Sequence, residues 1–121
     1  MVEIKDRQGP LANVRVVDLT SMIFGPYATQ IMADMGADVI KVEPLSGDDT
    51  RNISVGRTPG MGGVYVNVNR GKRSISLDLK SDEGKAALTK LIAGADIFIH
   101  SMRAKAIQRL GFDYPAVCAI N

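Results

Sequence analysis

Three basic side chains stand close to the ends of predicted strands. Lys80 directly follows one apolar run, and Arg103 and Arg109 come shortly after another. Ligands of open parallel sheets bind beyond the carboxyl ends of the strands, where cations can hold phosphates through charge-assisted hydrogen bonds. The alternative for each residue is an ordinary solvated surface, the usual environment of Lys and Arg. The position of the three residues favours an anion site and leaves the alternative open.

A second basic group has the same two interpretations. Arg70, Lys72 and Arg73 fall together at a predicted turn. The charge of the whole chain is also uneven, because residues 1–69 hold six basic and eight acidic side chains and residues 70–121 hold nine basic and five acidic. An anionic ligand should therefore prefer the second half of the chain.

Several polar or small residues have a structural interpretation that we favour over a functional one. Gly25 could open a helix N-terminus to a phosphate, but a helix start often needs only a small residue. His100 finishes an apolar run and matches no nucleophile motif, and Asp18 can cap the loop that follows its strand. Asp48 and Asp49 lie in a loop, where solvated charge is the default.

Composition and missing motifs argue against other functions. With one cysteine, Cys118, the chain cannot form an internal disulfide, and we expect no metal site. There is no G-x-G-x-x-G and no Walker motif, and a net charge of +2 is too small for a nucleic-acid binder. The start, MVEIKDRQGP, is charged where a secretory signal is apolar, and no run could span a membrane. We therefore expect a cytoplasmic protein.

The elements that must position these residues begin with a βαβ unit. Val14–Leu19 is a β-branched run that predicts a buried strand, and Pro26 can start the next helix. Tyr27, Ile31, Met32 and Met35 fall on one face of that helix, which should point inward, and Gly36 ends it. A second strand is predicted over Asp38–Val42, parallel to the first.

The rest of the chain continues the alternation of strands and helices. Residues 44–63 are rich in Gly and predict a mobile loop without regular structure. The run VYVNVN fits either a strand or a short helix. We then predict a strand over Ile75–Leu79, a helix capped by Ser81 and closed by Gly94, a strand over Asp96–His100, and helices over Arg103–Leu110 and Tyr114–Asn121. One α/β domain with a Rossmann-like parallel sheet and flanking helices results.

The chain as a whole resembles the type III CoA-transferases, a family that also contains α-methylacyl-CoA racemases. The likeness covers Pro10 to Asn121 and is carried by GADVIKVE, NRGKRS and LDLK in this order. The resemblance implies the amino-terminal, CoA-binding part of a larger Rossmann-like domain, in a chain about three times as long. It also implies a homodimer of interlinked subunits, acting on an acyl-CoA and a small carboxylic acid. The nucleophilic aspartate of the family would lie beyond Asn121, so no catalytic residue is expected here.

Carried over residue by residue, the resemblance predicts coenzyme A contacts in three strand-end loops, with Pro44 as a further addition. Ile23 stands where some relatives have Gln, and Ile cannot donate a hydrogen bond to an oxyanion. Pro44 stands where many have Arg, and Ser101-Met102-Arg103 replaces the start of a common Asn-x-x-Pro-Gly. The predicted contacts are Met22, Ile23, Leu77, Asp78, Leu79, Lys80, Ser101, Met102, Arg103 and Arg109.

Two other functions stay open at this stage. One is an acyl-CoA racemase or epimerase of the same family, which would need a His and Asp pair instead of a nucleophilic Asp. The other is a non-catalytic module that binds CoA or serves assembly. An incomplete α/β layer would expose apolar faces, so we also expect the isolated chain to self-associate.

Overall fold

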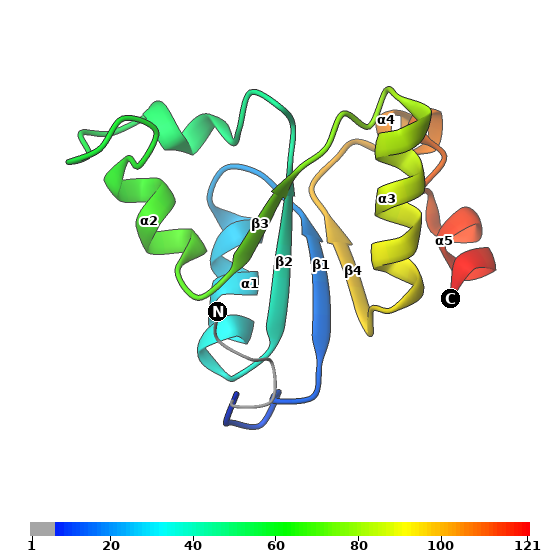
Figure 1. The fold of residues 1–121 in the computed structure, drawn as a ribbon, viewed down its shortest axis with the longest axis horizontal. Coiled ribbons are helices and arrows are strands. Elements are labelled where there is room, and N and C mark those ends of the chain that lie inside the picture. Colours follow the sequence, from blue (N-terminus) through cyan, green and yellow to red (C-terminus); the bar gives the residue numbers. More distant parts are fainter. Residues whose placement is uncertain (1–6) are drawn as a thin grey trace.

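The computed structural model describes residues 7–121, a parallel four-stranded sheet with helices on both faces (Figure 1). The strands lie in the order β3-β2-β1-β4, which confirms the predicted Rossmann-like α/β fold. Most of the start that argued against a secretory signal lies outside the described residues. The elements are β1 Arg15–Leu19, α1 Phe24–Asp34, β2 Asp38–Glu43, the 3-10 helix η2 Asp49–Asn52, α2 Gly63–Asn69, β3 Arg73–Ser76, α3 Asp82–Ala93, β4 Ile97–His100, α4 Ala104–Leu110 and α5 Tyr114–Ile120.

Strand β1 lies inside the sheet and pairs in parallel with β2 and β4. Strand β2 pairs with β3, so that Val42 lies opposite Ile75. Val16 and Val17 are completely buried, as expected for a parallel strand covered on both faces. Because α1 connects the parallel neighbours β1 and β2, the predicted βαβ unit is confirmed.

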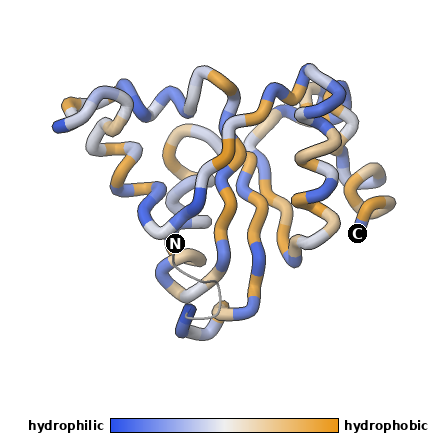
Figure 2. Tube along the Cα trace, in the orientation of Figure 1, coloured by the Kyte–Doolittle hydropathy of each residue, from blue (hydrophilic) through white to orange (hydrophobic). Residues whose placement is uncertain are grey.

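Different helices cover the two faces of the sheet. On one face, α3, α4 and α5 contribute to a cluster of buried apolar side chains. On the other, α1 packs over a smaller cluster formed by Val16, Ala37 and Val39. Figure 2 shows hydrophobic residues along the central strands, interrupted by hydrophilic ones. The first cluster consists of Val17, Val42, Leu88, Ile92, Ile107 and Phe112.

The prediction for the inward face of α1 is wrong. Tyr27, Ile31 and Met35 are 53%, 38% and 45% exposed. The buried positions of this helix include Thr29, whose hydroxyl donates to the buried carboxylate of Asp18. The sheet below α1 carries charged side chains at its carboxyl end, so a polar helix face packs there and most of the apolar stripe points outward.

In the second half of the chain the structure decides one open alternative and corrects one prediction. The run VYVNVN forms the helix α2, which settles the alternative left open by its pattern. The strand predicted over Ile75–Leu79 lies earlier, because β3 ends at Ser76 and the chain turns at Asp78. The Asp78 side chain accepts from the backbone N–H of Lys80 at 3.0 Å, and its carbonyl accepts from that of Ser81 at 3.1 Å. This turn places Leu77 to Lys80 at the carboxyl edge of the sheet.

Residues 44–63 differ from the expected loop without regular structure, because they contain η2. Its N-cap is Asp48, whose side chain accepts from the backbone N–H of Thr50. Asp48 and Thr50 are both buried, so the expectation of a solvated charge at Asp48 is wrong, whereas Asp49 is exposed. Whether the remainder of this loop moves stays a prediction.

The helices of the second half begin and end at the predicted signals. The Ser81 side chain accepts from the backbone N–H of Gly84 at 3.0 Å and caps α3, which ends at Gly94. The short final helix α5 is held by Asn121, whose amide donates to the carbonyls of Ile92 and Ala95 at 3.1 and 2.7 Å. Among the helices of residues 7–121, none has the length and apolar character that crossing a membrane requires.

Candidate functional site

A pocket of about 740 Å³ opens at the carboxyl ends of the strands. Its walls come from three strand ends and from the region of α4, segments that the parallel sheet brings to one edge. Its lining combines apolar side chains with polar and charged ones. The lining residues are Leu19, Thr20, Ser21, Lys41, Val42, Glu43, Pro44, Leu45, Ser46, Gly47, Asp48, Asp49, Leu77, Asp78, Leu79, Lys80, Met102 and Leu110.

The pocket brings together about half of the predicted contacts. Leu77, Asp78, Leu79, Lys80 and Met102 all line it, and so does the added Pro44. The other predicted contacts lie outside its lining, four of them in the loops after β1 and β4 and the fifth, Arg109, in α4. They are Met22, Ile23, Ser101, Arg103 and Arg109.

The two loops that carry four of these outlying residues are joined by a hydrogen bond. The backbone N–H of Ser21 donates to the hydroxyl of Ser101 at 3.0 Å. Met22 has a φ of 69°, the one positive φ of a non-glycine residue within residues 7–121. Such a conformation persists where the surrounding contacts hold it in place. The loop after β1 therefore lies against the loop after β4, next to the pocket.

A neighbouring residue leaves no room for a side chain at Gly25. A Cβ at this position would come within 2.4 Å of the side chain of Thr20. This close approach supports the structural interpretation of Gly25 that we favoured on the sequence.

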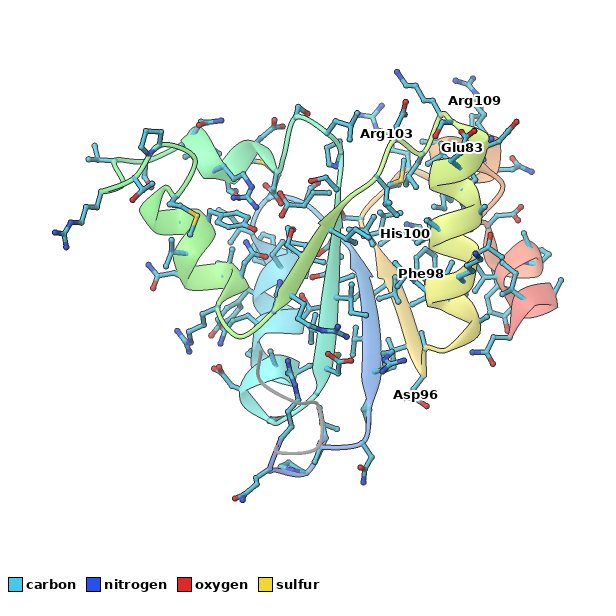
Figure 3. The ribbon with its side chains drawn as sticks, in the orientation of Figure 1. Glu83, Asp96, Phe98, His100, Arg103 and Arg109 are labelled. Atoms are coloured by element: carbon cyan, nitrogen blue, oxygen red, sulfur yellow. The ribbon has the colours of Figure 1, made fainter. Side chains whose placement is uncertain are left out.

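Arg103 and Arg109 lie at the two ends of α4. Arg103 is its N-cap and Arg109 belongs to its last turn. Figure 3 shows both at the same end of the molecule as Glu83 of α3, and far from Asp96 at the other end of β4. Both are exposed, as is Lys80. Within residues 7–121, none of these three cations has an ion-pair partner, so each is available to a ligand.

The second basic group, Arg70, Lys72 and Arg73, differs because each of its side chains has a carboxylate partner. Arg70 lies 2.8 Å from a carboxylate oxygen of Asp34, and Arg73 lies 2.7 Å from one of Asp38. The Lys72 side chain is 2% exposed and its Nζ lies 3.0 Å from Asp18. Nearby carboxylates thus pair with all three charges, which favours a structural role for this group.

Asp18 and His100 have the structural roles that the sequence favoured. Asp18 is fully buried and accepts from Thr20, Thr29 and Lys72. The Nδ1 atom of His100 accepts from the backbone N–H of Met102 at 3.2 Å, so the ring supports the start of the β4 loop. Neither residue lines the pocket.

Buried charges in the pocket lining were missed by the sequence analysis. The Lys41 side chain is 1% exposed, and its Nζ lies 2.8 Å from Asp48 Oδ2. Burial alone would raise the pKa of Asp48, but hydrogen bonds from Lys41 and Thr50 hold it below its usual range. A Lys inside a run of buried residues gave the only sequence signal, because a strand covered on both faces must pair such a charge.

Glu43 forms a second buried centre at the end of β2. Arg51 donates to both of its carboxylate oxygens, at 2.8 and 2.7 Å, and Tyr65 donates at 2.8 Å. Burial would raise the pKa of Glu43, but bonds from Arg51, Ser74, the Asp48 backbone and Tyr65 outweigh it and lower the pKa to about 2. Arg51 also donates to the carbonyl of Gly60 at 3.2 Å. It thereby ties the Gly-rich loop to the sheet.

Comparison with known proteins identifies the class of this fold and site. The profile of CoA-transferase family III matches residues 11–121, and the chain belongs to this family. It is 39% identical to a succinate–glutarate CoA-transferase of Agrobacterium fabrum over 100% of the chain and 32% of that relative. It is 42% identical to a succinyl-CoA:mesaconate CoA-transferase of Haloarcula hispanica, over 88% of the chain and 28% of the relative. The predicted family is therefore confirmed.

Solved structures agree with this assignment. A CAIB/BAIF family protein from Brucella suis superposes with a TM-score of 0.87 at 38% identity, covering 95% of this chain and 32% of that one. The protein Rv3272 of Mycobacterium tuberculosis superposes with a TM-score of 0.86 at 31% identity, covering 96% of this chain and 32% of that one. The chain thus spans about a third of the length of the relatives it matches, within their amino-terminal portion.

Proposed function

We propose that this chain is the coenzyme-A-binding part of a CoA-transferase, which moves CoA from an acyl thioester to a carboxylic acid. The observation that carries the proposal is the strand-end pocket, with the LDLK segment Leu77 to Lys80 in its wall. Membership of CoA-transferase family III and the names of the relatives support it.

The pocket suits a ligand with an apolar body and several phosphates. Leu45, Leu77 and Leu79 offer apolar walls, to which we assign the adenine ring and the pantetheine arm. We assign the phosphates to Lys80, Arg103 and Arg109, because these cations have no ion-pair partner within residues 7–121. Of the remaining predicted contacts, Asp78 would shape the turn that carries Lys80. Met22, Ile23, Ser101 and Met102 would place the pantetheine arm along the loops after β1 and β4.

The chemical step itself needs a residue that the family resemblance places beyond Asn121. In the proposed reaction an aspartate attacks the acyl thioester carbonyl and releases the CoA thiolate, so that a covalent acyl-enzyme forms. We propose that the acceptor is a small carboxylic acid, since relatives are named for transfer to or from succinate, glutarate, mesaconate and oxalate. The same names favour a transferase over a racemase or epimerase.

Titration calorimetry with CoA and with dephospho-CoA tests the proposal. We expect CoA to bind more tightly, because the cations should contact its 3′-phosphate. Arg103→Gln and Arg109→Gln should each weaken CoA binding by roughly tenfold, the loss of about 1.4 kcal/mol. Lys90→Gln, an exposed cation in the last turn of α3, is the matched control and should bind as the wild type does. Absent or equal heats for the two ligands would contradict the proposal.

We also propose that the isolated chain self-associates, and that a full-length relative of this chain is a cytoplasmic homodimer. The exposed apolar side chains around the start of α1 support association, since Phe24 is 91% exposed and Met22 and Ile23 nearly half exposed. Sedimentation velocity at rising concentration should show species larger than the monomer. A single monomer boundary at high concentration would contradict this.

A further inference from the structure

Lys41 lies in the pocket lining, where the loop after β1 and the loop after β2 meet. Its Nζ donates to the backbone carbonyl of Thr20 at 3.0 Å. The same atom lies 2.8 Å from Oδ2 of Asp48. Thr20, Lys41 and Asp48 all belong to the lining of the pocket. We call these three residues and their contacts the Lys41 junction.

On one side, the junction is fixed to η2. Oδ1 of Asp48 accepts from the backbone N–H and the hydroxyl of Thr50, at 2.9 and 2.7 Å. The backbone N–H of Asp48 donates to Glu43 Oε2 at 2.8 Å. A shift of Asp48 would therefore move the start of η2 and the pocket wall that precedes it.

On the other side, the junction is fixed to the loop after β1. The backbone N–H of Thr20 donates to Oδ1 of Asp18 at 2.9 Å, and Lys72 holds the other oxygen of Asp18 at 3.0 Å. The next residue, Ser21, donates to Ser101 in the loop after β4. Three strand-end loops are thus connected through hydrogen bonds of Thr20 and of its neighbour Ser21.

We propose that Lys41 is a positioning residue that sets the loop after β1 and residues 44–53 relative to each other, and so determines the shape of the ligand pocket. The proposal rests on the proposed function only for the identity of the ligand, CoA. Its physical basis is that burying an ammonium group is costly, and an apolar side chain would fill the same place with less loss of solvation. An apolar group could not bind a carbonyl on one loop and a carboxylate on the other at the same time.

A purely structural ion pair is the competing interpretation, and a matched control separates the two. Val39 lies two residues before Lys41 on the same strand and the same face, is completely buried, and lies outside the pocket lining. Val39→Ala lowers stability by removing apolar contacts, and it leaves the contacts of Thr20 and Asp48 in place. Lys41→Met removes those contacts and keeps much of the side-chain volume.

Hydrogen exchange and titration calorimetry with CoA are measured on wild type, Lys41→Met and Val39→Ala, well below the unfolding temperature of each variant. In Lys41→Met, amides of residues 19–24 and of residues 46–53 should exchange faster together, and CoA affinity should fall roughly tenfold, a size typical of coupling between sites. Val39→Ala should keep wild-type affinity and wild-type exchange in both segments.

Asp48→Asn provides a second variant if Lys41→Met does not fold. It removes the anion and keeps the shape of the side chain, so the same two segments should exchange faster by a smaller factor. Wild-type exchange in both segments, or a change confined to one of them, would overturn the proposal. If the wild type does not bind CoA, the proposed function fails, and the exchange measurement still decides the role of Lys41. If Val39→Ala loses as much affinity as Lys41→Met, the role of Lys41 is only structural.

Discussion

The two faces of the sheet are stabilised in different ways. Under α3, α4 and α5 the contacts are apolar, with Val42 packed in one cluster with Leu88 and Ile92. Under α1 and α2, neighbouring residues of the same strand, Lys41 and Glu43, are buried with charged partners. Apolar packing depends on volume and tolerates small shifts, whereas paired charges fix particular atoms at particular distances. We call the face under α1 and α2 the ionic face; its Lys41 and Glu43 line the pocket together with Val42 of the apolar face.

The largest effect is expected from leaving a charge unpaired on the ionic face. Asp18→Ala deprives Lys72, whose side chain is 2% exposed, of its carboxylate. The cost should be about 3–5 kcal/mol in the free energy of unfolding, measured by urea denaturation. Asp18→Leu combined with Lys72→Met removes both charges and should cost clearly less than Asp18→Ala. An equal or larger loss for the double variant would mean that the charges themselves stabilise the fold.

On the apolar face, Leu88→Ala should cost about 2–5 kcal/mol, because it leaves a cavity beneath α3. Leu88 is completely buried in the larger apolar cluster. The same urea titration measures the loss, and CoA affinity at a temperature where the variant is folded is the second measurement. Full loss of CoA binding by the folded variant would contradict the division between the two faces.

The ionic face should also make stability depend on pH in the acid range. The pKa of Glu43 is lowered from 4.5 to about 2 in the folded protein, so the folded state binds fewer protons than the unfolded state between these values. Glu43 therefore contributes its full stabilisation above about pH 4.5, and this contribution is lost as the pH falls toward 2. Thermal unfolding at several pH values should show a weaker acid dependence for Glu43→Gln than for wild type. An unchanged dependence would argue against an ionised Glu43 in the folded state.

A smaller effect is expected at the N-terminus of α3, which belongs to neither of the buried charge centres at Asp48 and Glu43. Ser81→Ala removes the side-chain bond to the N–H of Gly84 and should cost about 1 kcal/mol. Ser81→Asp keeps an acceptor at the cap and should restore most of the loss in the same thermal measurement. No recovery in Ser81→Asp would show that Ser81 acts through other contacts.

The smallest effect is expected for an ion pair on the surface. Arg70 and Asp34 keep 58% and 45% of their side-chain surface exposed, so water and salt screen their attraction. Arg70→Gln should leave the unfolding temperature unchanged within error. A loss comparable to that of Asp18→Ala would remove the distinction between buried and exposed pairs.

The fold could be predicted largely from local patterns. The β-branched run Val16-Val17, the capping Ser81 and the positive-φ position Gly36 each act over a few residues, and each predicted its element. Leu77 and Leu79 misled the prediction of β3, because an apolar pattern does not reveal where a chain turns away from its neighbour strand. The prediction of an inward apolar face on α1 failed for a similar reason. The polar face of α1 contacts Asp18, which comes from a different element.

The candidate site could be predicted only in part. The parallel sheet makes strand ends converge, so Leu79, Lys80 and Met102 could be placed at one edge from the sequence, whereas Leu77 and Asp78 came only from the family resemblance. The buried charges could not, because Lys72 and Asp18 are far apart in the chain and Lys is seldom buried. The order of charged residues along the sequence does not show which of them are buried together in the fold.

The last residue of the chain is held at the edge of the sheet opposite the pocket. Asn121 donates to carbonyls at the end of α3 and just before β4, whereas the pocket opens at the carboxyl ends of the strands (Figure 1). A biotin or affinity tag attached after Asn121 would therefore let the protein be tethered to a sensor surface with the pocket facing the flow.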